Sequence, residues 1–459
     1  MGRASTRHKF IGLNLYLHKQ NQRSCTCTIR PRNVAIAKIT RGIDHSRTPG
    51  YKSPTMSTAR TSFRTQQFPE SIIREMTRVA LGVGAVNLSQ GYPDFAAPQA
   101  IKDAAAQAIA DDHNQYSVTW GIKPLRDTIA RHYQRRYELE VHPDKNIVVC
   151  CGATESMLAS MLAVVNPGDE VIFFEPYYES YIPNCHITQS TPRFVSLRPP
   201  DPENMLQGLA GPGEWWFDPA ELAAAFTPKT KVIIITSPHN PTGKVFNRAE
   251  LEVIAALCQK HDVIAITDEI YEFITYDGTQ HIPIATLPGM ADRTITISGM
   301  SKTFAVTGWR LGFALAAEDL MTAVRKAHDF MSVCAATPLQ YAAIAALNLP
   351  DDYYAQMKAD YTWRRDFMIE TLRDVGFKPV VPQGAYYTMT NFSGIAGAPG
   401  NMDDIQFGLY MAKEIGVACV PGSPFFSRPE QSKNIVRFAF CKKPETLQLA
   451  RERLQKLKA

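Results

Sequence analysis

The chain has 459 residues, of which 45% are hydrophobic and 20% are charged. This length allows a large core and more than one domain, and the composition is ordinary for a globular protein. No apolar run approaches the ~18–20 residues of a membrane helix, so we expect no membrane partner. The nine cysteines show neither disulfide nor zinc spacing. We therefore expect reduced thiols and no metal site, including at Cys25 and Cys27.

The positive charge is concentrated at the N-terminus. Residues 1–55 carry a formal charge of +10, from eleven Lys and Arg against the single acid Asp44, and the rest of the chain carries −5. This Arg-rich, acid-poor leader is typical of an organelle transit peptide, but a mis-assigned start, with Met56 the real one, explains it equally well. A basic arm for nucleic acid is a weaker third interpretation. We expect a disordered, dispensable leader, no nucleic-acid partner and a cytoplasmic or mitochondrial location.

From about residue 145, short apolar runs alternate with helical patterns. Strands are predicted at 147–149, 171–174, 193–197, 232–235, 263–266, 294–297 and 311–315. Helices are predicted at 155–165, 219–226 and 248–261, followed by a helical stretch at 316–347. This alternation predicts an α/β fold in which a mostly parallel seven-stranded sheet lies between helices.

The C-terminal part has a different pattern, typical of a smaller α+β domain. An amphipathic helix is predicted at 350–375, strands at 385–390, 417–420 and 435–440, and a last helix from Pro444. We expect residues 56–100 to be turn-rich and to pack with this domain. We expect residues 199–216 to form a surface loop. The predicted parts are the leader (1–55), an N-terminal arm that joins the small domain (56–105), the large domain (106–345) and the C-terminal small domain (346–459).

Polar or small residues follow several of the predicted strands. Gly152-Ala153-Thr154 follows the first, Asn240 the fourth, and Asp268 and Tyr271 the fifth. Doubly wound sheets bind ligands at the carboxyl ends of their strands, and a small-residue turn into a helix is a natural seat for phosphate. Each feature alone could be a turn, a helix cap or tight packing. Several at successive strand ends favour a ligand site.

Lys302 follows the sixth predicted strand, among Ser298, Gly299 and Ser301. An amine buried there is poorly solvated, so its pKa falls and its neutral form can attack a carbonyl carbon. The small neighbours leave room for a flat ring and a phosphate. These properties suit a Schiff base to pyridoxal phosphate (PLP), although a lysine in this place could also simply cap a strand.

Three segments together resemble the PLP-dependent aminotransferases of classes I and II, which have fold type I. They are SPHNPTG (237–243), DEIYE (268–272) and SGMSKTFAVTGWRLG (298–312). The resemblance runs from about Asn87 to the C-terminus. It implies PLP as cofactor and transamination between an L-amino acid and a 2-oxo acid by a ping-pong mechanism. It also implies a homodimer with a shared active site.

The resemblance assigns a task to each residue that would surround the ring. Lys302 resembles the lysine that binds PLP as a Schiff base and later moves a proton at the substrate Cα. Asp268 resembles the carboxylate that pairs with the pyridine nitrogen. Asn240 and Tyr271 resemble the donors to the ring phenolate oxygen, and Tyr178 the aromatic residue that stacks on the ring.

The phosphate and the substrate carboxylate have implied partners as well. Arg310 resembles the phosphate arginine, with Ser301 and the Ala153-Thr154 turn beside it. Tyr116 resembles a tyrosine that crosses a dimer interface to the partner subunit's phosphate. The substrate carboxylate is assigned to two residues, Gly91 and Arg437.

The substrate is suggested by Thr154, which stands where relatives specific for dicarboxylic substrates often carry a lysine. Tyr177-Tyr178 add aromatic side chains, and the motifs are similar to those of the kynurenine, glutamine and methionine aminotransferases. Together these features predict amino donors of the aromatic, kynurenine, methionine or glutamine type. The alternatives are cysteine-conjugate β-lyase activity and an aspartate-type aminotransferase. A PLP-binding regulator or relic is disfavoured, because the catalytic residues are present and the leader shows no helix-turn-helix pattern.

Overall fold

The structure is a computed structural model that describes most of the chain. The described residues are 60–68, 70–200, 209–211, 213–398 and 400–458. The leader predicted at 1–55 lies outside them, as do residues 201–208 and 212 of the predicted loop. Within the described ranges, no helix combines the length and the apolar character that a membrane crossing requires.

The central sheet has seven strands, six of which run in the same direction. In spatial order they are β2 (Ile147–Cys150), β8 (Gly312–Leu315), β7 (Thr294–Gly299), β6 (Ile264–Asp268), β5 (Thr230–Thr236), β3 (Glu170–Glu175) and β4 (Thr191–Ser196). β8 pairs antiparallel with both of its neighbours, and all other pairs are parallel. The predicted strands and the mostly parallel α/β sheet are confirmed.

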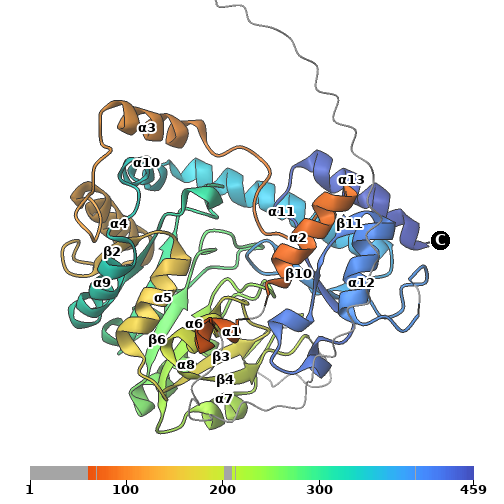
Figure 1. Ribbon diagram of the computed structural model, residues 1–459, viewed down its shortest axis with the longest axis horizontal. Helices are drawn as coiled ribbons and strands as arrows, with labels where there is room; N and C mark the ends of the chain where they lie inside the picture. Colours follow the sequence, from red (N-terminus) through yellow and green to blue (C-terminus); the bar gives the residue numbers. More distant parts are fainter. Residues whose placement is uncertain (1–59, 69, 201–208, 212, 399, 459) are drawn as a thin grey trace, which may run out of the picture. The chain divides into compact units, whose positions relative to one another are not determined.

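Helices cover this sheet on both faces. They are α5 (Ala153–Val164), α6 (Tyr181–Thr188), α7 (Pro219–Ala225), α8 (Arg248–His261) and α9 (Glu318–Ser332). In β5, Ile233 and Ile235 pack with α7 and α8, whereas Ile234 packs with α5, α6 and α9. Figure 1 shows α5 and α9 beside each other along the sheet. Burial on both faces explains why the strands are continuous apolar runs.

The expected helical stretch at 316–347 is confirmed, and it consists of two helices. After α9 the chain turns at Val333, whose φ of +66° is incompatible with a continuing helix, and α10 (Thr337–Leu347) begins anew. α10 packs against two helices that were not predicted, α3 (Gln99–Ala110) and α4 (Lys123–Tyr137).

A second, antiparallel sheet lies in the C-terminal part. Its strands, in spatial order, are β12 (Val420–Pro421), β13 (Ile435–Ala439), β10 (Tyr387–Asn391) and β9 (Lys378–Pro379). The helices of this part are α11 (Asp351–Asp374), α12 (Asp404–Tyr410) and α13 (Pro444–Leu454). The predicted helix at 350–375 and the three predicted strand regions are confirmed. The domain boundaries stay predictions.

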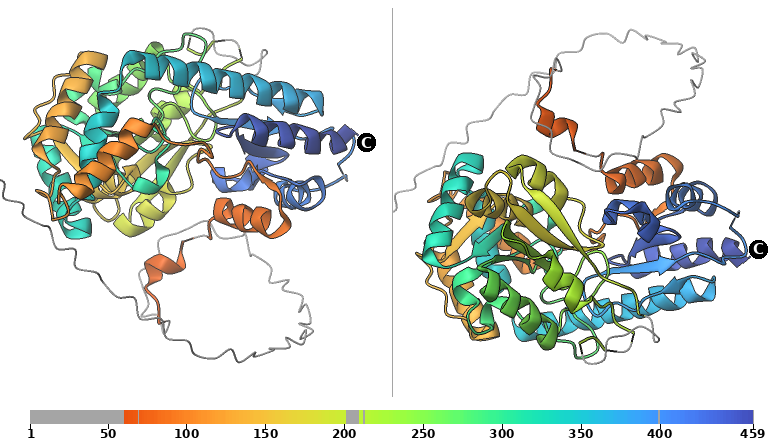
Figure 2. Two further views of the ribbon diagram at one scale, coloured as in Figure 1. Left: turned by 90° about the horizontal axis from the view of Figure 1, so that it is seen from above. Right: turned by 90° about the horizontal axis from the view of Figure 1, so that it is seen from below.

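The description of residues 56–100 as turn-rich is wrong. This stretch contains α1 (Phe63–Gln66) and α2 (Ile72–Val83), and β1 (Val86–Asn87) pairs with β11 (Val417–Ala418). The Ser71 side chain caps the start of α2, and a left-handed Gly84 ends it. As predicted, the segment packs with the C-terminal part: Figures 1 and 2 show α2, in orange, beside the blue C-terminal elements.

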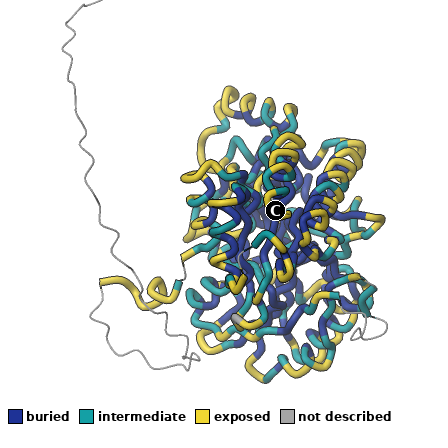
Figure 3. Tube along the Cα trace, turned by 90° about the vertical axis from the view of Figure 1, so that its right-hand side faces the viewer, coloured by how far each residue is buried: buried dark blue, intermediate teal, exposed yellow. Residues whose placement is uncertain are grey.

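Burial follows this layered arrangement. Figure 3 shows the buried residues in the interior of the trace and the exposed residues mainly on the outer helices. Trp215, which was expected in a surface loop, is buried in the same cluster as Phe217 and α8. Its large apolar ring is better placed in that core than in water, so this end of the predicted loop is part of the core.

Candidate active site

A cavity of about 540 Å³ lies at the edge of the central sheet where the parallel strands end. Eleven of the twelve residues predicted for the site line it: Gly91, Ala153, Thr154, Tyr178, Asn240, Asp268, Tyr271, Ser301, Lys302, Arg310 and Arg437. Four basic side chains and two carboxylates stand in the wall, so the cavity favours anionic ligands. Residues that are up to 346 positions apart in the sequence, from Gly91 to Arg437, therefore share one space.

Lys302 enters this cavity from the turn that follows β7. Its Nζ donates to the carbonyl oxygen of Gly91 at 3.2 Å and lies 5.7 and 5.8 Å from the ring centres of Tyr271 and Tyr386. Burial lowers the pKa of Lys302 to about 8. Near neutral pH the neutral amine, which is the form that attacks an aldehyde, is therefore far more populated than in an ordinary lysine.

Asp268 occupies the last position of β6, at the floor of the cavity. Its Oδ2 accepts a hydrogen bond from the Tyr181 hydroxyl at 2.8 Å, and its Oδ1 accepts one from the backbone N–H of Ile270 at 3.4 Å. Burial raises the pKa of this carboxyl group, while the Tyr181 bond opposes the rise. A partly buried carboxylate with unused acceptor capacity is suited to a cationic N–H, such as a protonated pyridine nitrogen.

The turn between β2 and α5 has the geometry of an anion seat. Gly152 precedes α5 at a φ of +88°, and a Cβ added there would lie 2.6 Å from Nη2 of Arg310. The guanidinium therefore lies directly against the turn. The hydroxyls of Thr154 and Ser301 line the same cavity, next to the N-terminal end of the helix. Together these groups present hydrogen-bond donors and positive charge to a phosphate.

Arg437 reaches the cavity from β13 of the second sheet and is only 1% exposed. Its Nη1 donates to Oδ1 of Asn240 at 2.9 Å, and its Nη2 donates to the carbonyl oxygen of Ser89 at 2.8 Å. Its Nε has no partner among the described residues. The guanidinium also lies 4.3 Å from the ring centre of Tyr387. A buried guanidinium with an unused donor is suited to a carboxylate ligand.

Gly91 lies on a backbone segment that several side chains hold in place. A Cβ at this position would be 1.8 Å from the hydroxyl of Tyr387, so no other residue fits without a shift. The Nζ of Lys442 donates to the carbonyl oxygens of Gln90, at 3.3 Å, and Tyr92, at 2.9 Å. Because Gly91 has no side chain, the backbone of this segment can lie directly at the cavity.

Tyr116 is the one predicted site residue that does not line this cavity. Its side chain is 82% exposed, and it lies between α3 and α4. Thr337 Oγ1 donates to the carbonyl oxygen of Gln115 at 2.7 Å, which attaches this segment to the start of α10. The chain thus presents Tyr116 outwards rather than to its own cavity.

Sequence reasoning missed two tyrosines of the site. Tyr181 holds Asp268, and the Tyr387 hydroxyl lies 3.0 Å from that of Tyr271 while its ring lies against Arg437. Tyr181 is the first residue of α6 and Tyr178 lies before that helix, so no helical spacing connected the two. No sequence signal pointed to Tyr387, because the second sheet brings it to the cavity.

The mouth of the cavity carries a cation that was also missed. Arg74, in the first turn of α2, lines the cavity and forms no ion pair with any described residue. Beside it, the Ser71 hydroxyl donates to Oε1 of Glu179 at 2.6 Å, which joins α2 to the loop after β3. The sequence offered no signal here, because residues 56–100 were described as turns.

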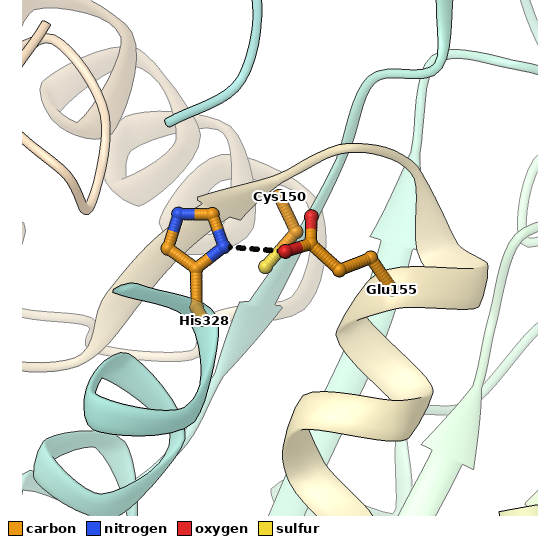
Figure 4. A group of neighbouring side chains, drawn as sticks. All are labelled: Cys150, Glu155 and His328. Atoms are coloured by element: carbon orange, nitrogen blue, oxygen red, sulfur yellow. Dashed lines mark hydrogen bonds and ion pairs between the residues drawn. The ribbon is translucent and has the colours of Figure 1, made fainter. Parts of the chain in front are cut away.

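All seven cysteines in the described ranges are free thiols, and Cys25 and Cys27 lie outside those ranges. In the same part of the chain, the side chains of Cys150, Glu155 and His328 come within 4.8 Å of one another behind the phosphate turn (Figure 4).

The donor and acceptor set of the cavity fits PLP. An amine with a lowered pKa can take the aldehyde, the Asp268 carboxylate can take the ring nitrogen, and the Gly152 turn with Arg310 can take the phosphate. Because Oδ1 of Asn240 accepts from Arg437, the amide nitrogen of Asn240 remains as a donor for the ring oxygen. Every polar group of the cofactor thus has a counterpart of the correct charge.

Comparisons with known proteins agree with this chemistry. Residues 83–454 match the family model described as aminotransferase class I and II. A human protein named kynurenine–oxoglutarate transaminase 1 is 38% identical over 403 residues, which cover 84% of this chain and 95% of that protein. A Dictyostelium discoideum kynurenine–oxoglutarate transaminase is 36% identical over 424 residues, covering 87% and 97%.

Solved structures of aminotransferases have the same fold. N-succinyldiaminopimelate aminotransferase from Mycobacterium tuberculosis matches with a TM-score of 0.81 and 35% identity, over 86% of this chain and all of that one. Escherichia coli YbdL, described as having a methionine aminotransferase function, matches with a TM-score of 0.79 and 30% identity, over 86% and 99%. The chain belongs to the class I and II aminotransferases, and it is a PLP-dependent fold type I enzyme that transfers amino groups between amino acids and 2-oxo acids.

Proposed function

We propose that the enzyme prefers amino donors with bulky uncharged side chains, of the aromatic, kynurenine, methionine or glutamine type. The observation that carries this proposal is the cavity wall. Thr154, the last residue of the phosphate turn, is itself uncharged, and Ile73, Tyr178 and Tyr387 supply apolar and aromatic surface. Such a wall favours a large side chain through burial and ring contacts. The names of the kynurenine and methionine aminotransferases among the relatives support the same substrate class.

In this proposal the predicted residues keep their predicted tasks. Lys302 would hold PLP through its amine, and its free amine would move the proton at the substrate Cα. When bound, PLP supplies a ring that accepts the electrons released at that carbon. Asp268 keeps the ring nitrogen protonated, and Asn240 and Tyr271 donate to the ring oxygen. Arg437 binds the substrate carboxylate through its guanidinium, which lines the cavity.

The remaining residues hold the cofactor in place. Tyr178 covers one face of the ring, and Gly91 brings its backbone close to the substrate carboxylate. The phosphate is bound by four groups: the N–H donors of Ala153 and Thr154, the Ser301 hydroxyl and the Arg310 guanidinium.

The amino acceptor in this proposal is a dicarboxylic 2-oxo acid. Lys302, Arg310 and Arg437 already have tasks, which leaves Arg74 as the cation in the wall without an assigned ligand. An arginine at the cavity mouth can bind the distal carboxylate of a molecule whose α-carboxylate lies on Arg437. The printed names of the kynurenine–oxoglutarate transaminases support an acceptor of this kind.

The proposal includes a homodimer in which Tyr116 reaches the partner subunit's phosphate. Tyr116 is 82% exposed, and the nearby Val118, Phe330 and Val333 are also exposed, which gives this side of the chain an apolar surface. Such a patch of large apolar side chains is typical of an interaction site. Sedimentation of the purified protein as a monomer at all concentrations would contradict this part of the proposal.

A substrate panel tests the proposal directly. Purified enzyme is given methionine, phenylalanine, kynurenine, glutamine or aspartate as donor, with 2-oxoglutarate or pyruvate as acceptor, and kcat/KM is measured for each pair. We expect the four uncharged donors to exceed aspartate and 2-oxoglutarate to exceed pyruvate. A strong preference for aspartate would refute the donor class. Pyruvate released from a cysteine S-conjugate, faster than its amino group is transferred, would instead indicate β-elimination.

A further inference from the structure

His328 of α9 is buried between two segments that lie behind the cavity. Its Nδ1 lies 2.9 Å from Oε1 of Glu155, in the first turn of α5, and its Nε2 lies 2.8 Å from the carbonyl oxygen of Thr119. Figure 4 shows the imidazole directed at the Glu155 carboxylate, with Cys150 beside both. Neither His328 nor Glu155 is among the groups that line the cavity.

The hydrogen bonds define the charge of this pair. Glu155 accepts from three donors, the backbone N–H of Cys151, the Ser332 hydroxyl at 2.5 Å and His328, so it is a carboxylate. Both ring nitrogens of His328 face oxygens that only accept, the carboxylate and the Thr119 carbonyl. Each nitrogen must therefore carry a proton, and His328 is an imidazolium. The pair is a buried ion pair with every polar atom satisfied.

The electrostatic surroundings agree with this assignment. Burial by itself would lower the pKa of His328, but its interactions with Cys150 and Glu155 outweigh it and raise the pKa to about 11. Burial opposes ionisation of Glu155 as well, yet bonds from His328, Ser332 and Cys151 hold its pKa below the usual value. His328 and Glu155 therefore form a buried ion pair, with Cys150 beside both.

The ion pair connects the two parts of the chain that serve phosphate binding in the proposed function. Glu155 receives the Cys151 N–H, and Cys151 adjoins Gly152 at the start of the phosphate turn. Thr119 belongs to the segment that presents Tyr116. The imidazolium of His328 lies between these two segments and holds both to α9.

We propose that His328 and Glu155 are positioning residues for the cofactor phosphate, which fix the Gly152–Thr154 turn from behind and tie it to the Tyr116 segment. This inference rests on the PLP site of the proposed function but not on the choice of amino donor. The pair touches neither cofactor nor substrate. It acts by holding the N–H donors of the turn in the orientation that a phosphate requires, which is the role of supporting residues at precisely built sites.

Cofactor affinity without substrate tests this role. Apoenzyme of Glu155→Gln and His328→Gln is titrated with PLP and, separately, with pyridoxal, which has the same ring and aldehyde but no phosphate. We expect the Kd for PLP to rise about tenfold to a hundredfold, since a hydrogen bond to a charged group contributes about 1.5–3 kcal/mol. The Kd for pyridoxal should change by less than about threefold, because the turn is not used.

The matched control is another buried His–Glu pair, His281 and Glu269, which lie 2.8 Å apart and are 2% exposed. His281→Gln should leave the ratio of the two Kd values unchanged. If either test variant does not fold, Ser332→Ala removes one bond to Glu155 and should shift the ratio in the same direction. Equal weakening of PLP and pyridoxal binding, or no change in PLP binding, would overturn the inference. If the donor panel contradicts the proposed substrate class but the ratio of the Kd values for PLP and pyridoxal is altered as expected, only the substrate class is overturned.

Discussion

Arg437 and Asn240 are joined by a hydrogen bond of 2.9 Å between Nη1 and Oδ1. Arg437 belongs to β13 of the second sheet, and Asn240 to the loop that follows β5 of the central sheet. The bond couples the group proposed for the substrate carboxylate to the group proposed for the ring oxygen. It also fixes the Asn240 amide, whose nitrogen is left to donate into the cavity.

Arg437→Lys should lower kcat/KM for every amino donor by about a hundredfold or more, since a lysine cannot keep the planar set of charged hydrogen bonds. The loss should fall mainly on KM. Steady-state kinetics with two donors of different size measure it. Binding of PLP to the apoenzyme serves as the control, and it should change little; equal kinetics of variant and parent would remove Arg437 from the carboxylate role.

Lys302→Ala should abolish the visible absorbance band of covalently bound PLP, because the amine that makes the bond is gone.

The parent protein offers a pH test of the same residue. With a pKa of about 8, the neutral amine fraction rises with pH below that value and then levels off. The rate at which apoenzyme takes up PLP should follow this curve. A rate that still increases roughly tenfold per unit above pH 9 would show an ordinary lysine.

Arg74→Gln should raise KM for 2-oxoglutarate about tenfold and leave KM for pyruvate nearly unchanged, because only the former has a second carboxylate. Arg78→Gln is the matched control. It removes a charge one turn further along α2, where Arg78 pairs with the exposed Glu70 and does not line the cavity. Equal effects of the two variants would mean that general charge, and not a contact with the acceptor, is responsible.

Gly91→Ala should strongly reduce activity and cost about 1–3 kcal/mol of stability, since its Cβ would lie 1.8 Å from the Tyr387 hydroxyl. Gly82→Ala, in α2, is the contrasting variant. No atom lies within 4 Å of a Cβ there, and alanine favours a helix by about 0.5–1 kcal/mol, so stability should rise. Thermal unfolding of both apoenzymes measures the difference; a tolerated Gly91→Ala would contradict the close packing at this site.

Mixed dimers test the proposed role of Tyr116. Lys302→Ala and Tyr116→Phe subunits are each impaired, but a dimer of one of each would contain one complete site. Refolding them together in equal amounts should restore about a quarter of the parent activity, because half of the dimers are mixed and each has one good site. Activity no higher than the average of the separate variants would place Tyr116 outside the partner subunit's site.

The sequence alone was sufficient to predict those site residues that directly follow a strand with a clear apolar pattern. Asp268, Lys302 and the Gly152 turn each stand at the end of a continuous apolar run, so strand and site could be predicted together. Arg74 and Tyr387 could not, because only the packing of α2 and of the second sheet brings them to the cavity. The break at Val333 was missed for another reason: the helical pattern continues through it, and only the backbone shows the left-handed turn.

The reversed direction of β8 determines how the cofactor anchors are spaced. β7 ends at the edge of the sheet where β8 begins, with Gly299 opposite Gly312. The chain between them therefore stays at this one edge, and Lys302 and Arg310 both lie there. The residues proposed as the covalent and the ionic anchor of PLP, Lys302 and Arg310, thus belong to a single short loop. A residue inserted or deleted between Lys302 and Arg310 would change the distance between the two side chains. The length of this loop therefore has to match the distance between the aldehyde and the phosphate of the cofactor.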